Sequence, residues 1–124
     1  MRSILFFILS LFTMHATHAQ FSDKRQLLIF GAAQSAPVKQ QLAQLDKEAK
    51  GLQERDLQVV LAAEKQALYK KYKVGDAEPF VLVLVGKDGG EKFRSLKPAT
   101  TAQLFGIIDA MPMRQSEMRG RKDE

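Results

Sequence analysis

The chain contains no cysteine and no tryptophan, and its two histidines, His15 and His18, both lie in the apolar N-terminal segment. Without a thiol it cannot carry out thiol–disulfide exchange, and its fold cannot depend on disulfides. If the N-terminal segment is removed, no histidine remains to act as the base of a Ser-His site or as a zinc ligand. These absences exclude the commonest redox, hydrolytic and zinc chemistries. No cofactor is expected.

The N-terminal segment has the features of a secretory signal peptide. Arg2 precedes an almost continuous apolar run over residues 4–12, and Thr17-His18-Ala19 supplies small residues at the cleavage position. We predict that residues 1–19 are a signal peptide cleaved after Ala19, and that the protein is periplasmic or secreted. The apolar run is shorter than the about 20 residues that cross a bilayer. A stable membrane anchor is therefore not expected.

The rest of the sequence predicts one α/β domain over residues 20–111, followed by a polar tail or short helix over residues 112–124. Apolar and β-branched runs predict four strands, at residues 25–30, 57–62, 80–85 and 91–95. Apolar residues spaced three and four apart predict three helices, at residues 37–52, 64–73 and 98–111. This order predicts a central mixed sheet of about four strands flanked by helices.

The charge of the chain gives little indication of its partner. Lysine and arginine number 19 against 14 acidic residues, for a formal net charge of +5. The lysines between Lys65 and Lys73 are interleaved with only two aromatics, Tyr69 and Tyr72, and suit the solvated face of a short helix. No dense basic patch is present, so a nucleic-acid partner is not expected.

Residues 30–39, Phe-Gly-Ala-Ala-Gln-Ser-Ala-Pro-Val-Lys, join the first strand to the first helix. The run resembles the F-W-A-x-W-C-G-P-C-K active-site stretch of thioredoxins, without a gap. Ser35 stands at the position of the attacking cysteine and Val38 at that of the resolving cysteine. Ile29 stands where thioredoxins place a buried aspartate. The resemblance implies a thioredoxin-like fold over about residues 25–111, with the thiol–disulfide oxidoreductase activity lost.

A second stretch, Tyr72 to Phe80, resembles the thioredoxin pattern Y-x-V-x-x-x-P-T and leads into a strand and a Lys87-Asp88-Gly89 turn. In that family the proline before the strand is cis and faces the helix N-terminus, so the resemblance implies a cis peptide bond at Pro79. The predicted export, the missing cysteines and the ending Asp109 to Arg114 also resemble the family called domain of unknown function 4174.

Three sets of residues are candidates for function. The Ser35 hydroxyl could bind or polarise a substrate, but without a histidine base we expect it to act as a helix N-cap. The backbone at Glu78-Pro79-Phe80 could pair with an extended peptide, or the proline could only shape the loop. The methionines of the mature chain, Met111, Met113 and Met118, could hold Cu(I), or could simply fill gaps in the packing.

The interpretation that follows is an exported, non-redox thioredoxin-like domain that binds a polypeptide or small-molecule ligand at the Ser35/Pro79 face, through Ser35, Glu78, Pro79 and Phe80. Two alternatives are Cu(I) binding by the methionines or chemistry that depends on Ser35. A third is a structural or assembly role, with a partner on the last helix and tail. The residues favour a binding domain over an enzyme.

Overall fold

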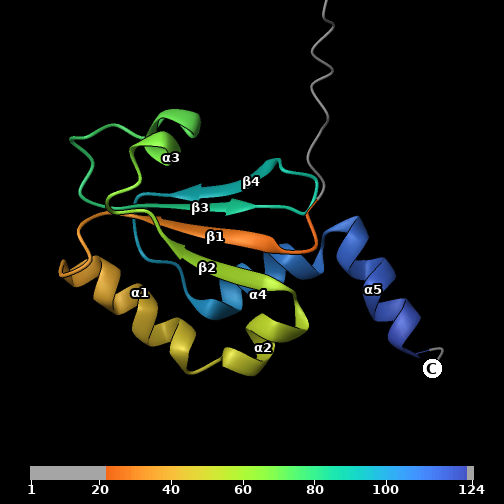
Figure 1. The fold of residues 1–124 in the computed structure, drawn as a ribbon. Helices are drawn as coiled ribbons and strands as arrows, with labels where there is room; N and C mark the ends of the chain where they lie inside the picture. The colour runs from red at the N-terminus through yellow and green to blue at the C-terminus, as the bar shows by residue number, and fades with distance from the viewer. Residues whose placement is uncertain (1–21, 123–124) are drawn as a thin grey trace, which may run out of the picture.

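The computed structural model describes residues 22–122, so the predicted signal peptide and its cleavage site lie outside the described residues. These residues form four strands and five helices, interspersed along the sequence (Figure 1). The strands are β1 (Arg25–Phe30), β2 (Leu57–Leu61), β3 (Val81–Val85) and β4 (Glu91–Ser95). The helices are α1 (Ala36–Asp46), α2 (Ala49–Glu54), α3 (Gln66–Lys71), α4 (Thr101–Asp109) and α5 (Pro112–Lys122).

The four strands form one mixed sheet in the order β2-β1-β3-β4. β1 runs parallel to β2 and antiparallel to β3, which in turn pairs with β4 as a hairpin. The two central strands are the most apolar, and every residue of β3 is buried. The predicted mixed sheet of about four strands is therefore confirmed.

Helices cover both faces of the sheet. Side chains alternate between the two faces along each strand, and the central strands are apolar at successive positions, so both faces carry apolar side chains. Leu27, Ile29, Leu82 and Leu84 face α1 and α4, and form the larger core cluster with residues such as Leu104. The other face carries Leu28, Phe30, Val81 and Val83, and is covered by side chains of α3 and the residue after it: Leu68, Tyr69 and Tyr72. In Figure 1, α3 lies on one side of the sheet and α1 and α4 lie on the other.

The first predicted helix is two helices rather than one. α1 ends at Asp46, and α2 starts at Ala49 after Glu48 leaves the helical region, with φ −124 and ψ 31. The break lets Gly51 approach α4 so closely that a Cβ there would lie 2.6 Å from the Phe105 ring. Leu52 still packs against the larger core. Val38, Leu42, Leu45 and Leu52 therefore face the core as the spacing predicts, but Ala49 is exposed and the helix is not continuous.

Residues 112–122, in the segment for which the sequence left a polar tail or a short helix open, form the helix α5 of 11 residues. Pro112 is its first residue, a position where the missing N–H costs nothing. α5 lies at the end of the sheet where β1 begins, away from α3 and the start of α1 (Figure 1).

The prediction of a cis peptide bond at Pro79 is wrong. Every peptide bond that the structure describes between residues 22 and 122 is trans. The Glu78 N–H donates to the Gly75 carbonyl at 3.2 Å, and this turn delivers the chain into β3. With that turn, the chain enters β3 in the trans form, which X-Pro bonds prefer intrinsically by about 0.5–1 kcal/mol.

Candidate functional site

The loops that follow β1 and precede β3 meet at Gly31. This glycine has φ +138, a conformation that side chains rarely adopt, and a Cβ there would lie 2.7 Å from the Pro79 carbonyl oxygen. Phe30, just before it, is buried edge-on against Tyr69 with ring centroids 4.9 Å apart. The sequence resemblance implied that the Pro79 loop faces the start of α1, and the structure places the two loops in contact.

Ser35 occupies the N-cap position of α1, with an extended backbone at φ −70 and ψ 149, but its side chain makes no cap hydrogen bond. Pro37 is the second residue of the helix and has no N–H to donate, so only Val38 could serve a cap hydroxyl. The Ser35 Oγ is instead buried without a hydrogen-bond partner in the described residues. The position was predicted correctly; the capping role of the hydroxyl was not. Thr100 makes this bond at α4, accepting from Gln103 N–H.

The residues Glu78, Pro79 and Phe80 differ in their accessibility. Glu78 and Pro79 are exposed, whereas Phe80 is 2% exposed and belongs to the larger core. A ligand could therefore contact Glu78 and Pro79 but not the buried Phe80 ring. The Glu78 N–H is already bonded to Gly75, so it is not free to pair with an added strand. The geometry thus gives this stretch a structural part, closing the loop against Gly31.

A groove of about 690 Å³ lies beside the loop between β1 and α1, at the end of the sheet where β1 and β2 finish. One wall is Ala32, Ala33 and Gln34, from the loop between β1 and α1. The other is Leu61, Ala63, Glu64 and Lys65, at the end of β2 and before α3. Leu61 is 42% exposed, unusual for a large apolar side chain. Sequence reasoning did not find this wall, although an alanine-rich loop after a strand was a visible signal.

The three methionines do not gather at one point. Met111 and Met113 line a groove of about 620 Å³ between the α4–α5 junction and the β3–β4 turn, and Met113 is 45% exposed. Met118 is five residues beyond Met113 on α5, which places it about 140° around the helix. Within residues 22–122, no group of His, Cys, Asp or Glu forms a metal-binding cluster. Met111 and Met113 therefore share one groove, whereas Met118 lies on another face of α5.

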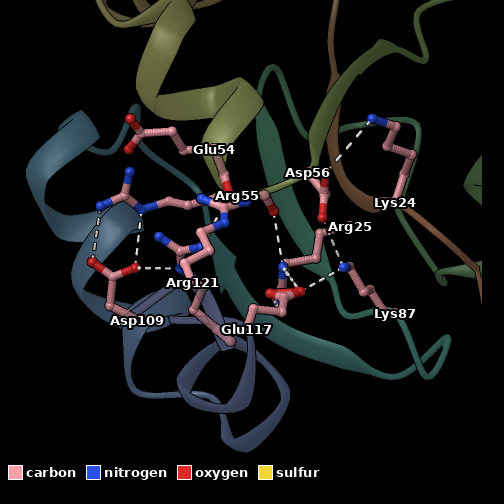
Figure 2. A network of polar contacts seen from close by, with 10 residues as sticks. Lys24, Arg25, Glu54, Arg55, Asp56, Lys87, Asp109, Glu117 and Arg121 are labelled. Atoms are coloured by element: carbon pink, nitrogen blue, oxygen red, sulfur yellow. Dashed lines mark hydrogen bonds and ion pairs between the residues drawn. The ribbon is translucent and has the colours of Figure 1, made fainter. Parts of the chain in front are cut away.

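Charged residues from distant parts of the chain meet where α5 contacts the sheet (Figure 2). Arg25, at the start of β1, is 1% exposed, and its Nη2 lies 3.2 Å from Glu117 Oε2. Lys87 contacts the same Glu117 carboxylate and also donates to Asp56 Oδ2 at 2.9 Å. Arg25 Nη1 donates to the Arg55 carbonyl at 2.9 Å. This cluster ties α5 to β1 and to the loop before β2.

A second ion cluster attaches α5 to α2 and α4. Arg55 Nη2 lies 2.9 Å from Asp109 Oδ2, and Arg114 Nε lies 3.2 Å from Asp109 Oδ1. Arg114 is 4% exposed and donates from Nη1 to the Glu54 carbonyl, and so does Arg121 from Nη2. Sequence reasoning missed both clusters. Their polar contacts connect structural elements, so we interpret them as stabilising the fold.

The carboxylates of these clusters have lowered pKa values. The Lys87 hydrogen bond lowers the pKa of Asp56. Burial alone would raise the pKa values of Asp109 and Glu117, but hydrogen bonds and charges from Arg55 and Arg114 on Asp109, and from Lys87 and Arg25 on Glu117, outweigh it. At neutral pH the three carboxylates are therefore ionised and paired.

These pKa shifts predict acid sensitivity. A carboxyl group whose pKa is lower in the folded state contributes stability above its unfolded-state value, and loses it as pH falls through the folded value. We expect the free energy of unfolding to stay level down to about pH 5 and to fall between about pH 5 and pH 3. Urea unfolding across this range would measure it. In the Glu117→Gln variant the free energy of unfolding should fall less steeply with decreasing pH. If it falls as steeply as in the natural chain, Glu117 does not contribute to the acid sensitivity.

None of the helices within residues 22–122 is long and apolar enough to cross a membrane.

The comparisons with solved structures show thioredoxin-like folds. Mitochondrial thioredoxin 3 from Saccharomyces cerevisiae is 24% identical, with a TM-score of 0.54, over 72% of this chain and 81% of its own. Thioredoxin-2 of a malaria parasite is 17% identical, with a TM-score of 0.58, over 71% and 84%.

StoA from Bacillus subtilis is 17% identical, with a TM-score of 0.52, over 68% of this chain and 81% of its own. At such identities these likenesses show the fold alone. A search of curated proteins by sequence gives no match. The family model described as "Domain of unknown function (DUF4174)" matches residues 18–117. The chain therefore belongs to this family, and it is a cysteine-free member with a thioredoxin-like fold.

Proposed function

We propose that this chain is an exported, non-redox binding domain that takes a polypeptide or small ligand at the loop end of its sheet. The observation that carries the proposal is the open groove of about 690 Å³ between the loop after β1 and the end of β2. It is of the size at which proteins bind small ligands or the side chains of a peptide. With no thiol in the chain, the ligand would be bound without disulfide exchange.

The lining of the groove supports binding of an apolar group. Three of the lining residues are alanines, whose short side chains leave the groove open, and Leu61 is its one large apolar side chain. Glu64 and Lys65 supply one charge of each sign, which suits an uncharged or zwitterionic ligand. α5 lies at the opposite end of the sheet, so its methionines do not fill this groove. An open groove favours a binding role over a purely structural one.

The experiment is an NMR titration of residues 20–124 with short peptides of different classes. We expect shifts at Ala32, Ala33, Leu61 and Lys65. Leu61→Asp should weaken binding about tenfold or more, because burying a leucine side chain is worth about 1.5–3 kcal/mol. Met113→Asp is the matched control: Met113 is similarly exposed, at 45% against 42%, but lies at the other end of the sheet.

If no peptide moves the groove resonances, or if Leu61→Asp binds as well as the natural chain, the proposal fails. The export part has its own check. The mature protein recovered outside the cytoplasm should begin at Gln20, the residue after the predicted cleavage position.

A further inference from the structure

The two edges of the sheet differ in how they are protected. β2, at one edge, reads Leu-Gln-Val-Val-Leu and has no charged residue, proline or glycine. β4, at the other edge, carries Glu91, Lys92 and Arg94, and its pairing with β3 has a register shift between Leu84 and Val85. Charged side chains and irregular pairing are the usual means by which proteins keep an edge from pairing with other strands. β2 has neither.

The pairing of β2 with β1 also shows which backbone groups of β2 point away from the sheet. Ala62 N–H donates to the Ile29 carbonyl at 2.9 Å, and the Asp56 carbonyl accepts from Arg25 N–H at 2.8 Å. Residues of a strand direct their N–H and C=O to alternate sides. The intervening residues Leu57, Val59 and Leu61 therefore direct theirs away from β1, where the described residues 22–122 supply no further strand.

We propose that the β2 edge binds an extended, uncharged apolar peptide, which adds a fifth strand to the sheet. The peptide would pair with the outward groups of Leu57, Val59 and Leu61, and its next side chain would enter the groove beside Leu61. This inference rests on the proposed function, and it names the ligand class and the way in which it is held. An uncharged peptide fits because the edge has no charge to pair with.

A second copy of this chain fits the edge less well. Antiparallel pairing of the whole of β2 with β2 of a second copy centres on Val59. It pairs Leu57 with Leu61 and ends there, short of the groove residues Ala63, Glu64 and Lys65. A flat contact between two strands would therefore leave the groove empty, whereas a peptide that continues past β2 can fill it.

The probe is an acetylated and amidated hexapeptide of alternating valine and threonine, titrated into residues 20–124. We expect slower amide exchange at Leu57, Val59 and Leu61, together with shifts at the groove residues Ala32 and Ala33. The same peptide with every amide nitrogen methylated should bind at least about tenfold more weakly, because neither of its edges can donate and it loses two or more backbone hydrogen bonds worth about 1 kcal/mol each.

Val59→Pro removes one outward N–H without removing a bond to β1, and edge strands tolerate proline at such positions. It should weaken the hexapeptide several-fold. If this variant does not fold, the methylated peptide still decides the question. Leu61→Lys should abolish binding, whereas Met113→Lys, at the other end of the sheet, should not.

The outcomes separate the two proposals. Groove shifts with unchanged exchange on β2, and equal affinity for the methylated peptide, would overturn strand addition and leave the proposed function standing. No shifts with any peptide would overturn both. A dimer in sedimentation equilibrium that Leu61→Lys abolishes, in a protein that does not bind the hexapeptide, would make a second copy the occupant and overturn this inference.

Discussion

Arg25→Ala is expected to lower the free energy of unfolding by about 3 kcal/mol, since breaking a buried ion pair usually costs about 3–5 kcal/mol. The Arg25 side chain is 1% exposed and donates both to Glu117 and to the Arg55 carbonyl. Alanine would leave that carbonyl without its donor and open a cavity under α5. Two facts keep the loss near the lower end: Glu117 retains Lys87, and the Arg25 Nε, buried without a partner in the described residues, is removed as well.

The matched control is Lys24→Ala, one residue earlier. Its ammonium lies 3.8 Å from Asp56, but the side chain is 54% exposed, so its loss should cost no more than about 0.5 kcal/mol. Arg25→Lys should fall between the two, because it keeps the charge and loses the two-pronged contact with Glu117. Urea unfolding of the three variants would test this order. A loss under about 1 kcal/mol in Arg25→Ala would show that α5 is not held through this residue.

The strands could be predicted from sequence because their signal is local. β3 is five apolar or β-branched residues in a row, and β1 is nearly so; buried central strands have this composition. The family pattern over residues 30–39 also placed the loop into α1 correctly. Strands and strand-to-helix loops of this kind depend on residues that are close together in the sequence, so a local pattern is enough to predict them.

The ion clusters could not be predicted in the same way. Arg25 and Glu117 are separated by 92 positions, and nothing in either segment indicates the other. Arg25 was assigned to a strand without any sign that it is buried, because an arginine is buried only when distant partners satisfy it. The same cause left the segment after residue 111 open between a polar tail and a short helix. The ion pairs that attach α5 come from β1, α4 and the β3–β4 turn, and its own sequence does not indicate them.

At the candidate site the resemblance gave the correct positions and the wrong details. Ser35 lies at the start of α1, as the pattern implied, but Pro37 removes one of the two N–H groups that a cap hydroxyl would accept from. The groove walls at Ala33 and Leu61 come from the loop after β1 and from the end of β2, which no motif connects. Local similarity transfers the course of the backbone more reliably than the role of a side chain.

The contact between these loops leads to the second large effect. Gly31→Ala is expected to lower the free energy of unfolding by about 3 kcal/mol. The residue has φ +138, where a side chain is strained by about 1–3 kcal/mol. The new Cβ would also lie 2.7 Å from the Pro79 carbonyl oxygen and 3.2 Å from Val38 Cγ2. The carbonyl belongs to the backbone entering β3, so it cannot move aside without disturbing the buried Phe80.

Gly75→Ala is the matched control, in the loop that leads to the same proline. A Cβ there would have no heavy atom within 4 Å, and Gly75 does not have a positive φ. This change should be neutral or stabilise by up to about 1 kcal/mol, because alanine restricts the unfolded chain more than glycine does. Urea unfolding gives both values. Since Gly31 borders the groove wall that begins at Ala32, Gly31→Ala should also weaken any ligand bound there, even where the variant is still folded. Equal stability of the two variants would mean that the loops after β1 and before β3 can separate freely, and the groove would then lose the fixed wall on which its binding depends.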